Sequence, residues 1–281
     1  MRRDTSTVRS RHLGSVLAEA IRTKGVLAQD IAARLDWSPP QISRLIRGRC
    51  RISADEVATI LAMCDVAAGP ARATLLELAA EAESPTWLQE HGERPAEPLA
   101  VRELEAAATR IVCADGGEVP ALLQARAYAA AVYLASPVIS AAEVGRRTDA
   151  LLERQTVLDR TSLVEAFVGA RALSRSGFGG TVMSEQVHHL LRLSVRPNIR
   201  LRVVPEPLFC PPFQLLHLTE AVPVVHVAHL NTTLLSQRPG TVAGYRRLVG
   251  RLDEWALGID ASRTLLGEVA TGFGDSLDKY L

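Results

Sequence analysis

The chain reads Ile31-Ala32-Ala33-Arg34-Leu35-Asp36-Trp37-Ser38-Pro39-Pro40-Gln41-Ile42-Ser43-Arg44-Leu45-Ile46-Arg47-Gly48 at its most informative point. Apolar residues recur at helical spacing on both sides of a break at Asp36 and Trp37. These apolar residues are Ile31, Ala32, Leu35, Ile42, Leu45 and Ile46. The pattern predicts two short helices joined by a tight turn, which is the arrangement of a helix-turn-helix.

The start of the second helix is specified by local chemistry. Ser38 and Gln41 fit the S-x-x-Q capping box, in which two side chains satisfy backbone groups at a helix start. Pro39 and Pro40 fall in the first turn, where backbone N–H groups have no partner within the helix. The sequence therefore predicts a helix that begins directly after Ser38.

Polar and basic side chains are left on the outward face of this second helix and in the turn that follows it. A helix that enters the DNA major groove presents its side chains in this way. The alternative is an ordinary solvated basic surface. We favour a DNA contact, and the residues predicted to make it are Ser38, Pro39, Pro40, Gln41, Ser43, Arg44, Arg47, Arg49 and Arg51.

The distribution of charge supports a nucleic-acid partner, although the whole chain carries a formal charge of only +1. Residues 1–51 contain eleven basic and four acidic residues, a charge of +7, so the remainder carries −6. A basic end can bind phosphate groups while an acidic remainder repels them. Double-stranded DNA is therefore the expected partner of the first part of the chain.

Residues 10–66 resemble the Xre (Cro/C1-type) helix-turn-helix regulators, whose second helix has the pattern S-x-x-x-[IV]-S-R-x-E-x-G. The chain keeps this pattern at Ser38, Ile42, Ser43, Arg44 and Gly48. It departs from the family at Ala28, Asp36 and Ile46, which replace the usual Gln, Gly and Glu. The change at Asp36 is mild, because Asp tolerates the left-handed backbone conformation that the turn glycine supplies.

The resemblance also implies which side chains contact bases. The first two residues after Ser38 commonly touch bases in the family, and here both are prolines. Base contacts are then expected from Gln41 and Arg44, since Gln pairs with adenine and Arg with guanine. A contact of the proline rings with thymine methyl groups stays open as an alternative.

Three domains or segments are expected along the chain. Residues 1–82 are predicted to form an all-α domain of five helices, like that of the lambda repressor. Residues 83–98 are rich in Pro and Glu and are predicted to be a linker, in which Trp87 docks on another part of the chain. Residues 99–281 are long enough for one sizeable domain, expected to be α+β and regulatory or partner-binding.

The second domain is expected to mix helices and strands. The predicted helices cover residues 101–109, 124–134, 141–158, 184–193, 241–257 and 262–269. The predicted strands cover residues 163–168, 199–204, 213–218 and 224–230.

Segments of this domain resemble recurrent segments of WhiJ-like regulators from high-GC bacteria, in which an uncharacterised domain follows an Xre domain. The segments are residues 119–131, 146–158, 197–205, 213–218 and 224–230. The resemblance implies a transcription factor whose second domain senses an effector or docks a partner. That partner is often a small acidic protein encoded beside it.

Patterns that would indicate an enzyme are sparse in the second domain. His188 and His189 are adjacent on a predicted helix and point about 100° apart. His226 and His229 fall on opposite faces of a predicted strand, so neither pair suits one metal ion. We therefore expect no enzyme, no cofactor and no metal site, although Glu165, Arg171 and His217 remain groups that could converge in space.

The cysteine spacing and the N-terminal residues indicate the cellular compartment and the redox state of the thiols. The four cysteines form no C-x-x-C pair, which disfavours a zinc site or a disulfide framework. The N-terminus is charged and no long apolar run occurs, which indicates neither a signal peptide nor a membrane span. A cytoplasmic protein with reduced thiols is the expectation.

A possible partner surface lies on the predicted helix over residues 141–158. Arg146, Arg147 and Arg154 are spaced so that they lie on nearly one face and form a cationic stripe for an acidic partner. The alternative is a solvated helix face, because Glu143 and Glu153 are neighbours. An apolar pocket between helices and sheet would be the place for a small-molecule effector.

The sequence as a whole predicts a homodimeric, sequence-specific transcriptional regulator. Two DNA half-sites about 10 base pairs apart follow if the dimer is two-fold symmetric. Two rival interpretations stay open, which are an enzyme domain tethered to a DNA-binding domain and an antitoxin-like protein-binding module that regulates its own expression.

Overall fold

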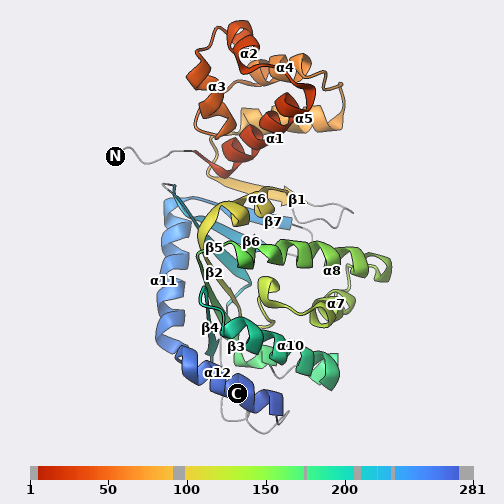
Figure 1. Ribbon diagram of the computed structural model, residues 1–281, viewed down its shortest axis with the longest axis vertical. Coiled ribbons are helices and arrows are strands. Elements are labelled where there is room, and N and C mark those ends of the chain that lie inside the picture. Colours follow the sequence, from red (N-terminus) through yellow and green to blue (C-terminus); the bar gives the residue numbers. More distant parts are fainter. Residues whose placement is uncertain are drawn as a thin grey trace. The chain divides into compact units, whose positions relative to one another are not determined.

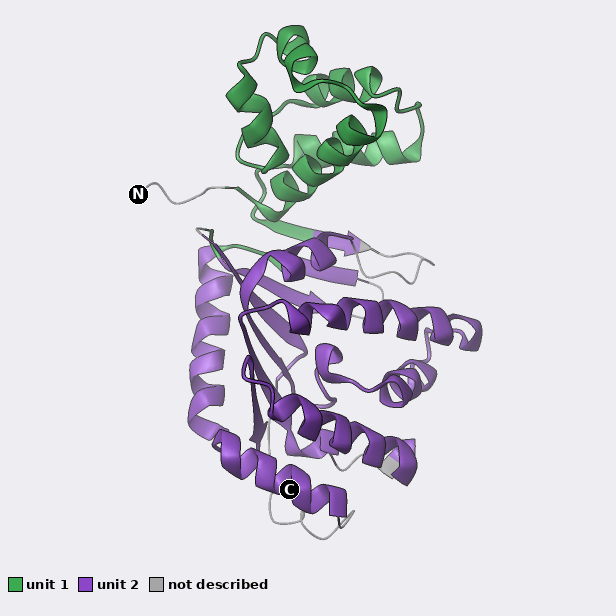
Figure 2. Ribbon diagram, in the orientation of Figure 1, with its two compact units in different colours: residues 1–87, 220–222, 235–238 green, residues 88–219, 223–234, 239–281 purple. Residues whose placement is uncertain are grey.

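The structure is a computed structural model that describes residues 6–90, 99–173, 176–205, 210–219, 221–228 and 232–271 (Figure 1). The chain divides into two compact units (Figure 2). Unit 1 comprises residues 1–87, 220–222 and 235–238, and unit 2 comprises the other residues. The domain boundaries predicted at residues 82 and 99 stay predictions.

Five helices lie within residues 6–90, which confirms the predicted helical N-terminal region. They are α1 (Val8–Lys24), α2 (Ala28–Leu35), α3 (Pro39–Ile46), α4 (Ala54–Met63) and α5 (Pro70–Ala80). Their apolar faces meet in one core, in which Leu17, Ile31, Val57, Ile60 and Leu61 have no exposed surface. Full burial of each such side chain contributes about 1.5–3 kcal/mol to stability.

The helix ends in unit 1 are set by residues that lie next to them in the sequence. Thr7 caps α1, and Ser53 caps α4 together with Glu56. Helix α1 ends at Gly25 and α2 ends at Asp36, both with a left-handed backbone (φ 73° and 54°). Asp36 thus adopts the left-handed conformation that was expected of it in this turn.

Residues 83–98 were predicted to be a linker, but part of this segment is regular. Strand β1 covers Thr86–Glu90, and residues 91–98 lie outside the described part of the chain. Trp87 in β1 packs against His12 of α1 with the ring centroids 5.3 Å apart, and the Arg9 guanidinium lies 6.0 Å from the Trp87 ring. The predicted docking of Trp87 is therefore confirmed, with α1 as the element it contacts.

A mixed seven-stranded sheet follows, in the order β1-β7-β6-β5-β2-β3-β4. Its other strands are β2 (Ala108–Asp115), β3 (Leu163–Gly169), β4 (Ile199–Val204), β5 (Phe213–Leu218), β6 (Val224–Ala228) and β7 (Thr232–Ser236). Strands β2, β3 and β4 are parallel, whereas β5 is antiparallel to both β2 and β6. Strand β2 is thus where the parallel and antiparallel halves of the sheet meet.

Helices cover both faces of this sheet (Figure 1). The described helices of unit 2 are α6 (Leu99–Ala107), α7 (Arg126–Ala135), α8 (Ala141–Gln155), α9 (Ala170–Leu173), α10 (Gly180–Ser194), α11 (Pro239–Trp255) and α12 (Ile259–Thr271). Short 3-10 turns η1 (Ala121–Leu123), η2 (Thr156–Asp159) and η3 (Ser176–Phe178) link some of them. Helices α7, α8 and α10 lie on one face and α11 lies on the other, so the arrangement fits the predicted α+β class.

The strand predictions agree with the structure where a strand has clear boundaries. Two predicted strands match β4 and β5 residue for residue, and the third differs from β3 only by Gly169. The fourth corresponds to β6, which ends at Ala228, while residues 229–231 lie outside the described segments. The predicted strands do not include β2 or β7. At β2, α6 passes directly into the strand without a Gly or Pro to mark the change.

None of the helices in the described ranges is long and apolar enough to span a membrane.

Candidate nucleic-acid interface

The outward face of α3 is formed by residues that recur one turn apart. Pro40, Arg44 and Arg47 are all exposed and occupy positions i, i+4 and i+7, which lie on one side of a helix. Ile42 and Leu45 lie on the opposite side and are each only 1% exposed. The buried pair therefore fixes which face of α3 meets solvent.

The start of α3 is closed by a side-chain cap. The Gln41 Oε1 atom accepts hydrogen bonds from the Ser38 backbone N–H at 2.7 Å and from the Ser38 hydroxyl at 2.8 Å. The Gln41 backbone N–H donates to the Ser38 carbonyl at 2.9 Å. The capping box predicted from Ser38 and Gln41 is confirmed.

The turn between α2 and α3 is fixed to α4. The Asp36 and Trp37 backbone N–H groups both donate to the Ala32 carbonyl, the second at 2.8 Å. The indole N–H of Trp37 donates to Glu56 Oε1 at 3.1 Å, and Glu56 also caps α4 through Ser53. One carboxylate thus ties the turn before α3 to the first turn of α4.

The end of α3 lies directly against α1. A Cβ atom on Gly14 would lie 2.4 Å from the Leu45 carbonyl oxygen and 2.7 Å from that of Ile46. A Cβ atom on Gly48 would lie 2.6 Å from the Arg11 backbone, and Gly48 also has a left-handed φ of 67°. Only glycine fits at these two positions, which lets α1 hold the end of α3 by backbone contact.

The arginines of the predicted interface differ in their partners. Within the described part of the chain, Arg44 and Arg47 are exposed and have no ion pair. Arg49 is exposed, and Arg51 forms an ion pair with Glu83 in which both side chains are mostly exposed. Arg44 and Arg47 are therefore the cations of this surface that an anion can reach without displacing a carboxylate.

The remaining residues of the predicted interface surround the start of α3. Ser38 and Pro39 are exposed, whereas Ser43 is half-buried. The structure thus brings Ser38, Pro39, Pro40, Gln41 and Arg44 together at one end of α3. Their contact with DNA stays a prediction.

The predicted cationic stripe on α8 is not one surface. Arg154 is buried and donates from Nε to Glu105 Oε2 of α6 at 2.7 Å, with only 4% and 1% of the two side chains exposed. Arg146 and Arg147 remain near the surface of α8, each 3.6 Å from Glu143 Oε1, but the Arg147 side chain is only 18% exposed. Arg154 lies on the face of α8 that also buries Val144, Thr148 and Leu151, so seven-residue spacing from Arg147 did not place it outside.

Three glutamine side chains fix the irregular segment 119–125 of unit 2. Gln186 of α10 accepts from the Ala125 N–H at 2.6 Å and donates to the Leu123 carbonyl at 2.8 Å. Gln155 donates to the carbonyls of residues 121 and 124, and Gln124 donates to that of Val119. The segments that carry the WhiJ-like resemblance thus include residues with a structural role.

Two of the three polar residues that the sequence leaves free to converge, Glu165 and His217, lie beside Arg110 of β2. Glu165 of β3 pairs with Arg110 of β2 and lies 3.6 Å from Arg200 of β4, two partners that the sequence did not indicate. His217 of β5 lies opposite Arg110 in the strand register. The signal for this cluster is the pairing of polar positions in neighbouring strands, which becomes visible only once the strand order is known.

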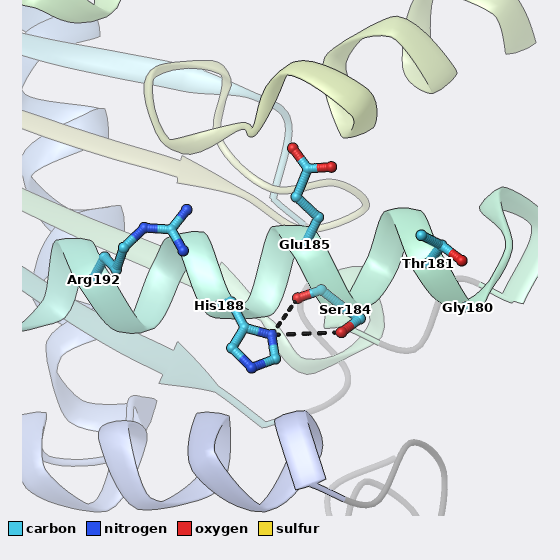
Figure 3. A pocket seen from close by; sticks show the side chains of 6 residues that line it. All are labelled: Gly180, Thr181, Ser184, Glu185, His188 and Arg192. Atoms are coloured by element: carbon cyan, nitrogen blue, oxygen red, sulfur yellow. Dashed lines mark hydrogen bonds between the residues drawn. The ribbon is translucent and has the colours of Figure 1, made fainter.

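One open depression of about 570 Å³ lies along α10 and is lined by Gly180, Thr181, Ser184, Glu185, His188 and Arg192 (Figure 3). All six residues come from one helix. The His188 Nδ1 atom lies 2.8 Å from the Ser184 carbonyl of the same helix. Among the described residues, no second element contributes a polar group to the depression, which therefore lacks the convergent side chains of an effector or catalytic site.

Other titratable groups of unit 2 are held in the interior. Burial raises the pKa of the Cys113 and Cys210 thiols to about 12, and the four cysteines are free. His226 Nδ1 lies 2.9 Å from Gln214 Oε1, whereas His229 falls outside the described residues. Over the described ranges, no group of three or more His, Cys, Asp and Glu side chains is placed to hold a metal ion.

Comparison with known proteins identifies a family and a distant structural likeness. Residues 99–268 match the family described as a domain of unknown function (DUF5753). No curated protein matches the chain. Among solved structures, it is similar to TrmBL2, described as an archaeal chromatin protein with a novel mode of DNA binding, at 15% identity and a TM-score of 0.35. That match covers 73% of this chain and 66% of TrmBL2, so the chain spans just under two thirds of that protein, and a likeness this weak supports no conclusion here.

Proposed function

The chain belongs to the DUF5753 family, and we propose that it is a sequence-specific DNA-binding regulator in which α2 and α3 form an Xre-type helix-turn-helix. The observation that carries the proposal is the exposed row of Pro40, Arg44 and Arg47 on α3. The opposite side of α3 is buried, so this row is the only side of the helix available to a groove. A helix presented in this way fits the major groove of B-form DNA.

Rigid support of α3 also favours this proposal. Its start is capped by Gln41, the preceding turn is tied to α4 through Trp37, and its end lies against Gly14 of α1. Base recognition needs side chains that are held in place by their surroundings. Support at the start, the turn and the end meets that requirement.

The charge of residues 1–51 supplies the attraction to the DNA backbone. Their formal charge of +7 contrasts with −6 over the rest of the chain. Phosphate contacts of this kind make binding salt-dependent and give it orientation, while base contacts give it selectivity. We therefore assign Arg44 to a base and Arg49 to the DNA backbone.

The test is the affinity of single arginine variants for a duplex that the full-length chain selects from a random library. Arg44→Ala should weaken binding to that duplex by about 1–3 kcal/mol and relax the preference at one base position. Arg49→Ala should lower the slope of affinity against salt by about one unit and leave the preference unchanged. Arg22→Ala, which removes an exposed arginine paired with Glu19 on α1, is the control. An unchanged footprint and preference with Arg44→Ala would contradict the assignment.

We also propose that two copies act together on DNA. One helix-turn-helix contacts only a few base pairs, and a two-fold dimer doubles this contact with half-sites about 10 base pairs apart. Sedimentation equilibrium of the full chain with duplexes of 10- and 15-base-pair spacing tests this. Equal binding of one copy at both spacings would contradict a dimer.

For unit 2 we propose a regulatory role through a small acidic protein partner rather than a reaction. The hairpin of α7 and α8 favours this role, because it exposes 61% of Leu134 and 54% of Val138 and carries the exposed Arg146. Exposed apolar side chains beside a cation suit a protein interface. Co-purification with the product of the adjacent gene tests the proposal. Arg146→Glu should abolish the complex, and Arg192→Glu on α10 should leave it intact.

A further inference from the structure

The start of α3 has few groups left with which to contact DNA. Pro39 and Pro40 have no backbone N–H, and the Gln41 N–H donates to the Ser38 carbonyl. The backbone donors that usually make a helix start an anion site are therefore missing or used. A DNA phosphate therefore finds no free backbone donor at this end of α3.

The Gln41 side chain is also engaged. Adenine recognition by glutamine needs both the amide oxygen and the amide nitrogen, which together contact the N6 amino group and N7. In the structure the Gln41 oxygen already accepts two hydrogen bonds from Ser38, at 2.7 and 2.8 Å. Reading adenine would break the cap that starts the helix, at a loss of stability.

Two other kinds of group remain on this face. The rings of Pro39 and Pro40 are exposed and apolar, and Arg44 carries exposed hydrogen-bond donors. An apolar side chain in the major groove fits the methyl group of thymine, and arginine fits guanine through O6 and N7. Pro40 and Arg44 are about 6 Å apart along the helix axis, which corresponds to about two base-pair steps of B-form DNA.

We propose that Gln41 is a positioning residue that contacts no base. We also propose that α3 selects a guanine through Arg44 and, within about two base-pair steps of it, a thymine whose methyl group contacts the proline rings. This proposal rests on the proposed function, since it specifies how the same helix reads DNA. It revises the sequence-based expectation that Gln41 reads adenine. The exposed rings of Pro39 and Pro40 then have a role besides that of starting the helix.

The first experiment changes single atoms of the DNA and leaves the protein intact. In the duplex that the full-length chain selects, each thymidine is replaced in turn by deoxyuridine, which lacks only the methyl group. One replacement within about two steps of a selected guanine should weaken binding about fourfold, the value of one buried methyl group. Replacing that guanine by 7-deazaguanine should weaken binding about tenfold or more, because N7 is lost. Equal affinity for every deoxyuridine duplex would overturn the contact with the proline rings.

The second experiment separates the cap from base reading. Gln41→Glu keeps an acceptor for Ser38 but removes the amide nitrogen, so thermal stability and base preference should match the wild type while overall affinity falls uniformly. Gln41→Ala loses the cap and should lower the melting temperature without a change in preference. Glu143→Gln makes the reverse exchange in the Ser140–Glu143 capping box of α8 in unit 2 and is the control. A changed preference at an adenine position in Gln41→Glu would overturn the positioning role.

The outcomes also separate this inference from the function on which it rests. If the wild-type chain selects no duplex at any ionic strength, the proposed function fails and the inference fails with it. If the wild type selects a site that requires adenine opposite Gln41, the function stands and only the inference is wrong.

Discussion

The two units hold their irregular segments in opposite ways. In unit 1 the turn and ends around α3 are held by neighbours in the sequence, such as Ser38 with Gln41, and by the bare backbone of Gly14 and Gly48. In unit 2 the segment 119–125 and helix α6 are held by polar side chains that are distant in the sequence, such as Gln186 and Arg154. The first solution uses close backbone contact, and the second uses buried hydrogen bonds.

This difference predicts which kind of substitution destabilises each unit. Where backbones touch, an added methyl group has no room, because protein interiors are close-packed. Where a buried polar side chain satisfies other groups, its removal leaves those groups without a partner in a medium of low polarity. Unit 1 should therefore be sensitive to added atoms, and unit 2 to removed polar groups.

The largest effect is expected at the buried ion pair of unit 2. Arg154→Met leaves the Glu105 carboxylate buried without its cation and should lower the free energy of unfolding by about 4 kcal/mol. Urea unfolding followed by circular dichroism measures this. Combining it with Glu105→Leu should recover part of the loss, since an apolar pair avoids the stranded charge.

The matched control is the exposed ion pair between α7 and α8. Arg126 and Asp149 are 2.7 Å apart, but each side chain is 61% exposed. Asp149→Asn should leave the unfolding curve nearly unchanged, because exposed pairs contribute little. If Arg154→Met and Asp149→Asn lower the free energy of unfolding equally, burial does not decide how much an ion pair contributes to the stability of unit 2.

The second-largest loss of stability is expected in unit 1, at a position where an added side-chain atom has no space. Gly48→Ala places a Cβ atom against the Arg11 backbone and puts alanine at a φ of 67°, so the free energy of unfolding should fall by about 3 kcal/mol. Thermal unfolding and duplex binding should both be measured, because α1 holds the end of α3 at this point.

Gly25→Ala isolates the backbone part of this effect. Gly25 has a φ of 73°, but an added Cβ atom would meet nothing within 4 Å. Its loss should be about 1–2 kcal/mol, from the left-handed backbone alone. If the two variants lose the same stability, close backbone contact does not hold α3.

A smaller loss is expected from the glutamine that fixes segment 119–125. Gln186→Leu strands the Ala125 N–H and the Leu123 carbonyl, and should lower the free energy of unfolding by about 2 kcal/mol after the gain from the apolar side chain. Glu185→Leu, at an exposed position of the same helix, should have little effect. Amide hydrogen exchange at residues 119–125 should rise only in the first variant.

The same contrast explains what the sequence revealed. The cap at Ser38, the turn at Asp36 and the helices of unit 1 were predictable, because the residues that specify them lie within a few positions of one another. For the candidate site, this placed Pro40 and Arg44 on one face, but not the engagement of the Gln41 oxygen or the ion pair of Arg51.

Several features of unit 2 depend on contacts between residues that are distant in the sequence, and these features have no local signal. Strand β2 followed a helix without a breaker, and the burial of Arg154 depends on Glu105, which lies 49 positions away. Helical spacing predicts which residues share a face, but only the packing of α6 against its surroundings decides which face is buried. The cluster of Arg110, Glu165 and Arg200 likewise depends on the strand order.

The smallest effect is a dependence of unit 2 on pH. Burial, together with Arg110 and Arg246, lowers the pKa of His217 from its ordinary value of 6.5, and Glu165 opposes this only in part. The unfolded chain therefore takes up a proton near pH 6.5 while the folded chain still resists it. The free energy of unfolding should be constant above pH 6.5 and fall as pH is lowered towards the pKa of the folded state.

Urea unfolding between pH 8 and 5 measures this fall, and His217→Gln should make it shallower. Arg246→Gln should shrink it as well, because one of the two cations that disfavour the imidazolium is removed. His189 also has a lowered pKa through burial, so part of the slope should remain in the first variant. If His217→Gln keeps the full slope, the proton uptake occurs elsewhere, and the polar strand cluster is not where unit 2 resists a buried charge.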